Sequence, residues 1–193
     1  DALRIMRQNQ VRRLPVLDDE GKMVGMVSEM DLLYASPSPA TSLSIYEMHY
    51  MLTRLEVDEV MSTDLITIAP DTLLEEAARI MADNKIGGLP VVEDGRLVGI
   101  ITETDIFKVF LELLGGREKG LRLTVEMPER KGEIARMTTA IAKAGGNIIA
   151  LGSFQGDDPT TGQMTVKVDQ ISAEALEAAM HDLDLEILHI QET

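Results

Sequence analysis

The sequence predicts an α+β protein built from a tandem repeat and a separate C-terminal βαββαβ segment. Residues 4–33 read RIMRQNQVRRLPVLDDEGKMVGMVSEMDLL and residues 79–107 read RIMADNKIGGLPVVEDGRLVGIITETDIF, so one unit is written twice with a single deletion between the copies. After residue 120, strand-like and helix-like patterns follow in an order that the repeat does not contain. The repeat fixes the folding unit and predicts a pseudo-two-fold arrangement of its two copies.

Each copy predicts the order helix, strand, turn, strand, helix. In the first copy the predicted elements are a helix up to residue 11, hairpin strands over 14–17 and 23–27, and a helix from residue 30. The second copy adds a lead-in strand over 60–68, and Pro70, Asp71 and Thr72 predict a capped helix start after it. The equivalent lead-in strand of the first copy would precede Asp1, so we expect the first copy to lack it.

Between the copies, a Ser-Pro segment over 36–42 predicts a stiff linker, and 44–55 predicts a helix with one apolar face. The last helix of the repeat ends at Gly115 and Gly116, which indicates a domain boundary over 117–120. The predicted division is a first repeat copy over 1–35, a linker and helix over 36–56, a second copy over 57–115 and a last domain over 120–193.

The last domain predicts a ferredoxin-like βαββαβ fold. Its expected strands cover 121–126, 147–153, 164–168 and 185–190, and its expected helices cover 132–144 and 173–181.

Composition excludes several functional classes. A net charge of −15 opposes binding to nucleic-acid phosphates, and an aromatic content of 3% leaves few platforms for base stacking. The chain has no apolar run long enough to cross a membrane, and its lack of cysteine fits the cytoplasm. The three histidines are scattered without metal-ligand spacing, and the twelve methionines mostly occupy core-type positions. We therefore expect no metal site, no nucleic-acid partner and no membrane partner.

The repeat resembles a pair of CBS domains (a Bateman module). The resemblance rests on the Leu-Pro-Val strands at 14–16 and 89–91 and on two matching endings, Gly25-x-x-Ser28-x-x-Asp31 and Gly99-x-x-Thr102-x-x-Asp105. The last domain resembles an ACT domain on Met127-Pro128-x-x-x-Gly132-x-x-Ala135 and on Ala-Gly-Gly-Asn-Ile at 144–148, but it has Glu129-Arg130-Lys131-Gly132 where that family has a D-x-P-G turn. This domain order is similar to that of the acetoin-utilisation protein family AcuB.

The resemblance implies a non-catalytic regulatory protein that binds an adenosine nucleotide (AMP, ADP or ATP) in clefts shared between the copies. Asp31 and Asp105 would hold ribose hydroxyls, and Ser28 and Thr102 would reach phosphate. The remaining residues implied for the Asp31 cleft are Asp64, Ile66, Ile86 and Gly87, and those implied for the Asp105 cleft are Val11 and Arg12.

Two features predict that these clefts differ. We expect Arg12 and Arg13 to supply positive charge to the Asp105 cleft, whereas the Asp31 cleft has Gly87 and Gly88 in their place. The lead-in strand that would complete the Asp105 cleft is the one that the first copy is expected to lack. We therefore expect nucleotide to bind best at the Asp31 cleft. Taken singly, an Asp at a helix start is commonly a cap, and an Arg pair is often solvated.

Two other functions remain open at this stage. The chain would be a structural dimerisation module if its clefts are vestigial, and a homodimer is expected in either case because closed two-fold pairs are the commonest assemblies. An enzyme that hydrolyses the nucleotide would need a general base or a metal cluster, and the sequence offers neither.

Overall fold

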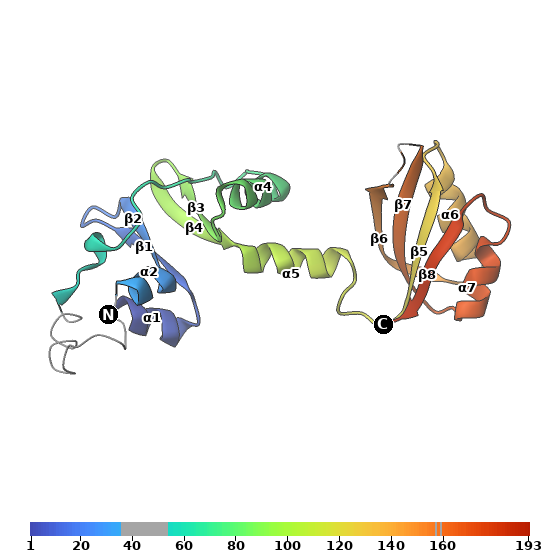
Figure 1. Cartoon of the computed structure of the whole chain (residues 1–193), viewed down its shortest axis with the longest axis horizontal. Coiled ribbons are helices and arrows are strands. Elements are labelled where there is room, and N and C mark those ends of the chain that lie inside the picture. Colours follow the sequence, from blue (N-terminus) through green and yellow to red (C-terminus); the bar gives the residue numbers. More distant parts are fainter. Residues whose placement is uncertain (36–53, 157, 159) are drawn as a thin grey trace. The chain divides into compact units, whose positions relative to one another are not determined.

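The computed structural model describes residues 1–35, 54–156, 158 and 160–193 (Figure 1). The predicted linker over 36–42 and all but the end of the predicted helix over 44–55 lie outside these residues. The chain divides into two compact units, Asp1–Ile106 and Phe107–Thr193. The division falls inside helix α5 (Glu103–Leu113), whereas the sequence places the start of the last domain near residue 120.

Both copies of the repeat form the predicted hairpin with its flanking helices. The first copy consists of α1 (Ala2–Asn9), β1 (Arg13–Leu17), β2 (Met23–Ser28) and α2 (Glu29–Tyr34). The second consists of α4 (Leu74–Asn84), β3 (Gly88–Glu93), β4 (Arg96–Thr102) and α5. The copies match in detail, because α1 and α4 both end at a residue in the left-handed conformation, Gln10 and Lys85, each with φ of 55°.

The predicted lead-in strand over 60–68 is wrong as a strand. A short 3-10 helix, η1 (Val57–Glu59), precedes an extended segment that makes one isolated bridge to each hairpin, Ser62 to Met26 and Ile68 to Val91. The segment runs from the first hairpin to the second, so neither pairing extends into a ladder. We name residues 62–68 the crossing segment.

The predicted cap of the second copy's first helix is also wrong. Helix α4 has Leu73 at its N-cap and no side-chain cap bond. The hydroxyl of Thr72 instead accepts a hydrogen bond from the Ala69 N–H at 3.1 Å, so it closes the turn before the helix.

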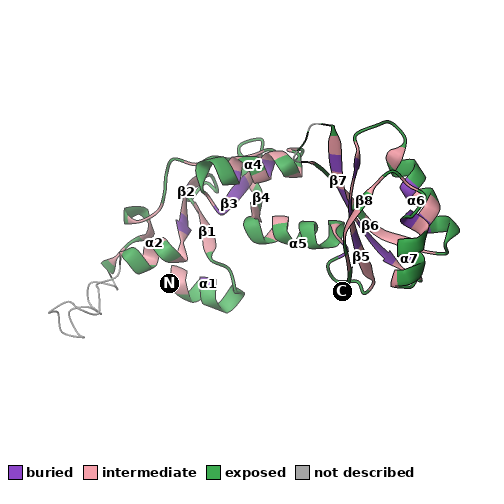
Figure 2. Cartoon of the chain, turned by 45° about the vertical axis from the view of Figure 1, so that its right-hand side comes forward, coloured by how far each residue is buried: buried purple, intermediate pink, exposed green. Residues whose placement is uncertain are grey.

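The C-terminal unit has the ferredoxin-like order that the sequence predicts. Its elements are β5 (Leu121–Pro128), α6 (Glu133–Lys143), β6 (Asn147–Gln155), β7 (Thr161–Asp169), α7 (Ala173–Met180) and β8 (Glu186–Glu192). The strands form an antiparallel sheet in the order β6-β7-β5-β8, with both helices on one face (Figure 1). Alternate residues of β5 are buried, whereas in β7 the alternation ends at three consecutive buried residues, 166–168. Figure 2 colours the buried stretches of both strands.

A buried lysine holds the connection between α5 and β5 against the sheet. Lys167 of β7 is 2% exposed, and its ammonium group donates hydrogen bonds to the backbone carbonyls of Gly115, at 2.8 Å, and Glu118. Arg122 donates to the carbonyl of Leu114 at 2.9 Å. Three backbone carbonyls that follow α5 therefore accept hydrogen bonds from charged side chains.

Candidate functional site

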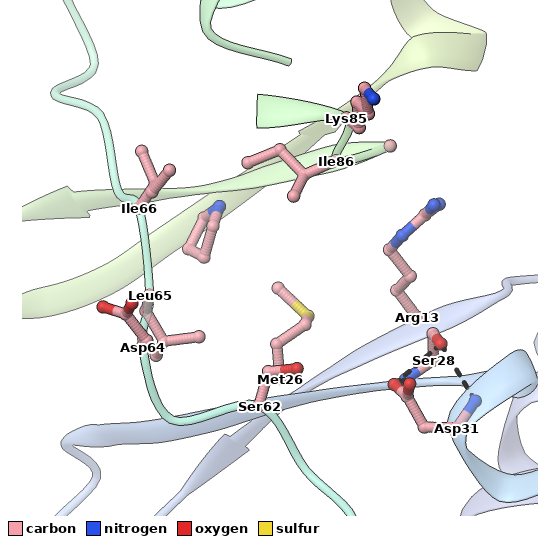
Figure 3. Close-up of a pocket in the computed structure, with 13 residues that line it drawn as sticks. Arg13, Met26, Ser28, Asp31, Ser62, Asp64, Leu65, Ile66, Lys85 and Ile86 are labelled. Atoms are coloured by element: carbon pink, nitrogen blue, oxygen red, sulfur yellow. Dashed lines mark hydrogen bonds between the residues drawn. The ribbon is translucent and has the colours of Figure 1, made fainter. Parts of the chain in front are cut away.

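A cavity of about 330 Å³ lies between the two copies of the repeat (Figure 3). Its lining comes from three places: the first hairpin and the start of α2, the crossing segment, and the strand entry of the second copy. The lining residues are Arg13, Met26, Ser28, Asp31, Ser62, Asp64, Leu65, Ile66, Lys85, Ile86, Gly87, Gly88 and Pro90. This volume falls within the range of small-molecule sites in proteins.

Asp31 is fixed in the cavity wall by a capping box with Ser28. The N–H and the hydroxyl of Ser28 both donate to Asp31 Oδ2 at 2.7 Å, and the Asp31 N–H donates to Ser28 Oγ at 3.2 Å. A serine at the N-cap and an acid three residues later satisfy each other's backbone donors, which is why this sequence starts a helix here. Asp31 Oδ1 has no hydrogen-bond partner among the described residues, so it is an acceptor that a ligand can use.

The second copy repeats the two bonds to the carboxylate at Thr102 and Asp105. The N–H and the hydroxyl of Thr102 donate to Asp105 Oδ2 at 3.0 and 2.7 Å. Each helix start is also tied to the strand entry of its own copy, since the Glu29 N–H donates to the Arg12 carbonyl and the Glu103 N–H donates to the Gly87 carbonyl. The pseudo-two-fold relation predicted from the repeat therefore extends to individual hydrogen bonds.

The crossing segment forms the wall opposite Asp31. In Figure 3, Asp64, Leu65 and Ile66 lie on the far side of the cavity from Arg13, Ser28 and Asp31. Leu65 is half-buried and Ile66 is 37% exposed, so this side presents apolar surface to the cavity. Ile86 and Pro90 of the second copy add further apolar surface.

Arg13 lies in the Asp31 cavity, which corrects the expectation that it supplies charge to the Asp105 cleft. A Cβ atom added to Gly87 would clash with the Arg13 guanidinium and would lie 2.8 Å from its Cζ. The Arg13 guanidinium therefore occupies space that is open because residue 87 has no side chain. Lys85 is a second cation at the cavity, and its side chain is exposed.

Six of the ten predicted site residues line this cavity: Ser28, Asp31, Asp64, Ile66, Ile86 and Gly87. The other four, Val11, Arg12, Thr102 and Asp105, do not line it. Sequence reasoning placed Gly88 at this cleft correctly but missed Arg13, Met26, Ser62, Leu65, Lys85 and Pro90 as lining residues. Arg13 is the first residue of β1 and Arg12 precedes the strand, so the alternation of side chains along the predicted strand over 14–17 does not indicate which of the two arginines enters the cavity.

The arrangement suits recognition of a polar small molecule. One side offers the carboxylate of Asp31 and the guanidinium of Arg13, and Lys85 lies beside Ile86 of the second copy. The crossing segment offers apolar surface together with the carboxylate of Asp64. No three His, Asp or Glu side chains within the described part of the chain are grouped so that they could hold a metal ion. None of the helices described in the structure is long and apolar enough to span a bilayer.

Comparison with known proteins identifies the repeat. A family model described as CBS domain matches residues 1–38 and 57–112. A CBS domain-containing protein of Dictyostelium discoideum is 32% identical over 114 residues, which cover 58% of this chain and 79% of that protein. The chain spans only 30% of the length of another relative, an uncharacterized protein of Methanocaldococcus jannaschii that is 37% identical over 129 residues.

Solved structures resemble the same part of the chain. A Vibrio cholerae protein described as an acetoin utilization protein (AcuB) is 36% identical, with 61% of this chain and 79% of that chain covered and a TM-score of 0.49. The protein CBSX2, crystallised in complex with AMP, is 32% identical, with 57% and 79% covered and a TM-score of 0.46.

Proposed function

The chain belongs to the CBS-domain family, and from this premise we propose that it is a non-catalytic ligand sensor that binds an adenosine nucleotide in the Asp31 cavity. One observation carries the proposal: a carboxylate oriented by a capping box faces apolar side chains across a cavity of about 330 Å³. A nucleotide has the matching parts, a ribose with adjacent hydroxyl donors and a flat base whose faces can pack against apolar side chains.

Asp31 is the proposed ribose acceptor. Its Oδ2 atom is occupied by Ser28, so Oδ1 takes the hydroxyl hydrogen of the ligand. A carboxylate is a strong acceptor for such donors, and the two bonds from Ser28 keep it oriented before the ligand arrives. We therefore assign Ser28 to the positioning of Asp31.

The base is proposed to lie against Leu65, Ile66 and Ile86. These side chains are partly exposed without a ligand, so a base that covers them removes apolar surface from water. Adenine is favoured over other bases by the family resemblance, while the apolar wall itself fits any flat base.

Calorimetric titration of the whole chain with AMP, ADP and ATP tests the proposal. Asp31→Ala should abolish or strongly weaken binding. Asp105→Ala is the matched control, because it removes the corresponding box of the second copy outside this cavity. Equal losses from both variants would refute the preference for the Asp31 cavity. Nucleotide turnover, followed by chromatography of the same samples, would refute the non-catalytic role.

We further propose a homodimer, which also fits the alternative of a structural module with vestigial clefts. Helix α5 exposes Phe107, Phe110 and Leu113 by 67%, 51% and 66%, at three-residue spacing along one side. Phe110→Glu should shift the chain to a monomer in sedimentation velocity. A dimer without nucleotide binding would favour the structural module.

The C-terminal unit is proposed to be an ACT domain on its ferredoxin-like topology and on the motifs around Pro128 and Gly145. A role in acetoin utilisation is proposed from the domain order alone, since no residue of the cavity indicates that substrate.

A further inference from the structure

Solvent-accessible methionines are concentrated in and around strand β2. Met23, Met26 and Met61 are half-buried, and Met30 is 54% exposed. Met23 and Met26 belong to β2, Met30 follows in α2, and Met61 directly precedes the crossing segment. An oxidant in solution therefore reaches methionine, within the described part of the chain, mainly in this region. The other methionines that the structure describes are at most 5% exposed: Met6, Met81, Met127, Met137, Met164 and Met180.

The second copy of the repeat has no sulfur at the matching positions. Met23, Met26 and Met30 correspond there to Leu97, Ile100 and Thr104. The two hairpins pair in the same register, so this fold does not require methionine at these positions. The sulfur atoms are a property of the first copy, and the first copy supplies Asp31 to the cavity.

Met26 brings its sulfur into the cavity. It is among the lining residues, whereas Met23, Met30 and Met61 are not. In Figure 3 its thioether extends from β2 into the space between the crossing segment and Arg13.

The backbone beneath this side chain is held in place. Met26 and Ser62 exchange both of their backbone hydrogen bonds, and the Met61 side chain covers the neighbouring Gly25, where an added Cβ would lie 2.8 Å from Met61 Cγ. A larger group at the end of the Met26 side chain must therefore take its room from the cavity.

We infer that Met26 is a redox switch for the ligand site, because its oxidation to the sulfoxide lowers the affinity for nucleotide. With hydrogen peroxide as oxidant, the sulfur lone pair attacks one oxygen, the O–O bond breaks and an S–O bond forms. The proton of the transferred oxygen leaves with the other oxygen as water, so the sulfur is oxidised and the peroxide is reduced. The sulfoxide is larger and polar, so the cavity loses both volume and apolar surface. This inference rests on the proposed function, since the affinity that changes is that for nucleotide in this cavity.

Peroxide treatment of the whole chain followed by calorimetric titration with AMP tests the switch. Treatment continues until mass spectrometry of peptides shows Met26 as the sulfoxide. We expect the AMP affinity to fall by roughly tenfold, the effect of enlarging a side chain in a closely packed site. Methionine sulfoxide reductases for both epimers should restore the affinity, because they return the thioether.

Two variants identify the sulfur that is responsible. Met26→Leu keeps a similar volume but has nothing to oxidise at this position, so its AMP affinity after peroxide should equal its own affinity before treatment. Met30→Leu is the control, because it removes an exposed methionine outside the cavity and should lose affinity after peroxide as the natural chain does. AMP present during the treatment should slow the oxidation of Met26 and leave that of Met30 unchanged.

The outcomes separate this inference from the proposed function. An unchanged AMP affinity once Met26 is fully oxidised, or an equal loss in peroxide-treated Met26→Leu, would overturn the switch while the nucleotide site stands. So would a Met26 that resists peroxide under conditions that oxidise Met30. Absence of binding of AMP, ADP and ATP to the untreated chain would overturn the proposed function, and this inference with it.

Discussion

Met26 and Ser62 exchange both of their backbone hydrogen bonds, each at 2.9 Å, although they belong to different parts of the repeat. Met26 lies in β2 of the first copy, and Ser62 begins the crossing segment that leads to the second copy. At the other end of this segment, the Ile68 N–H donates to the Pro90 carbonyl at 3.0 Å, and the Val92 N–H donates to the Ile68 carbonyl at 2.8 Å. The crossing segment, which forms the wall opposite Asp31, is therefore held by backbone hydrogen bonds at both of its ends.

Ser62→Pro should detach the first end of the crossing segment from β2. Proline has no N–H, so the bond from Ser62 to the Met26 carbonyl is lost and the anchored end of the segment is released. We expect AMP affinity to fall by tenfold or more while circular dichroism keeps the natural spectrum, since the hairpins remain paired. Ser62→Ala keeps both backbone bonds and serves as the control. Unchanged AMP affinity in Ser62→Pro would show that the crossing segment does not shape the site.

Ser28→Ala should lower both stability and ligand affinity. The substitution removes the hydroxyl that donates to Asp31 and accepts from its N–H, at 2.7 and 3.2 Å. Loss of an N-cap of this kind costs about 1 kcal/mol in the free energy of unfolding, which urea denaturation measures. Thr102→Ala removes the corresponding hydroxyl in the second copy and should cost a similar amount. Only Ser28→Ala should also weaken AMP binding, and a loss of affinity in Thr102→Ala alone would contradict the assignment.

The repeat made most of the first unit predictable. The two copies in register predict each hairpin, each flanking helix and each hydroxyl-carboxylate pair, because the same local sequence pattern occurs twice. The periodicity of the C-terminal segment gave its βαββαβ order for a similar reason: each strand has one face in the core, so its apolar residues alternate.

The errors occur where the copies meet. The sequence of 60–68 has the composition of a strand, yet its neighbours are two different hairpins, and the segment makes one bridge to each. The repeat pairs Arg13 with Gly88 and so predicts opposite clefts for them, whereas both residues line the Asp31 cavity. Such tertiary choices leave no mark on a single segment, so they cannot be predicted from local patterns.

The ion pair between Glu76 and Arg79 should be visible in a pH titration. Arg79 donates to both Glu76 oxygens, at 2.6 and 2.9 Å, and this hydrogen bonding lowers the pKa of the Glu76 carboxyl below its usual value of 4.5. Since the pKa is lower in the folded state, the pair stabilises the fold above pH 4.5. That contribution disappears as the pH falls through the lowered pKa. Carboxyl chemical shifts measured by NMR should give a lower midpoint for Glu76 in the natural chain than in Arg79→Gln. Equal midpoints would show that the pair does not persist in solution.

Lys167→Met should destabilise the C-terminal unit. Methionine matches much of the length and apolar character of the lysine stem but has no donor, so the carbonyls of Gly115 and Glu118 lose their partner. A buried acceptor without a partner costs about 1–3 kcal/mol, which chemical denaturation of the whole chain can resolve. Lys131→Met is the control, because Lys131 is exposed in the turn before α6 and should change the unfolding free energy little. Hydrogen exchange adds a local readout: faster exchange over residues 114–120 in Lys167→Met, with natural rates in the first hairpin, is the expected pattern. If Lys167→Met proves as stable as the natural chain, or more stable, the apolar packing of this side chain outweighs its hydrogen bonds and the connection does not depend on them.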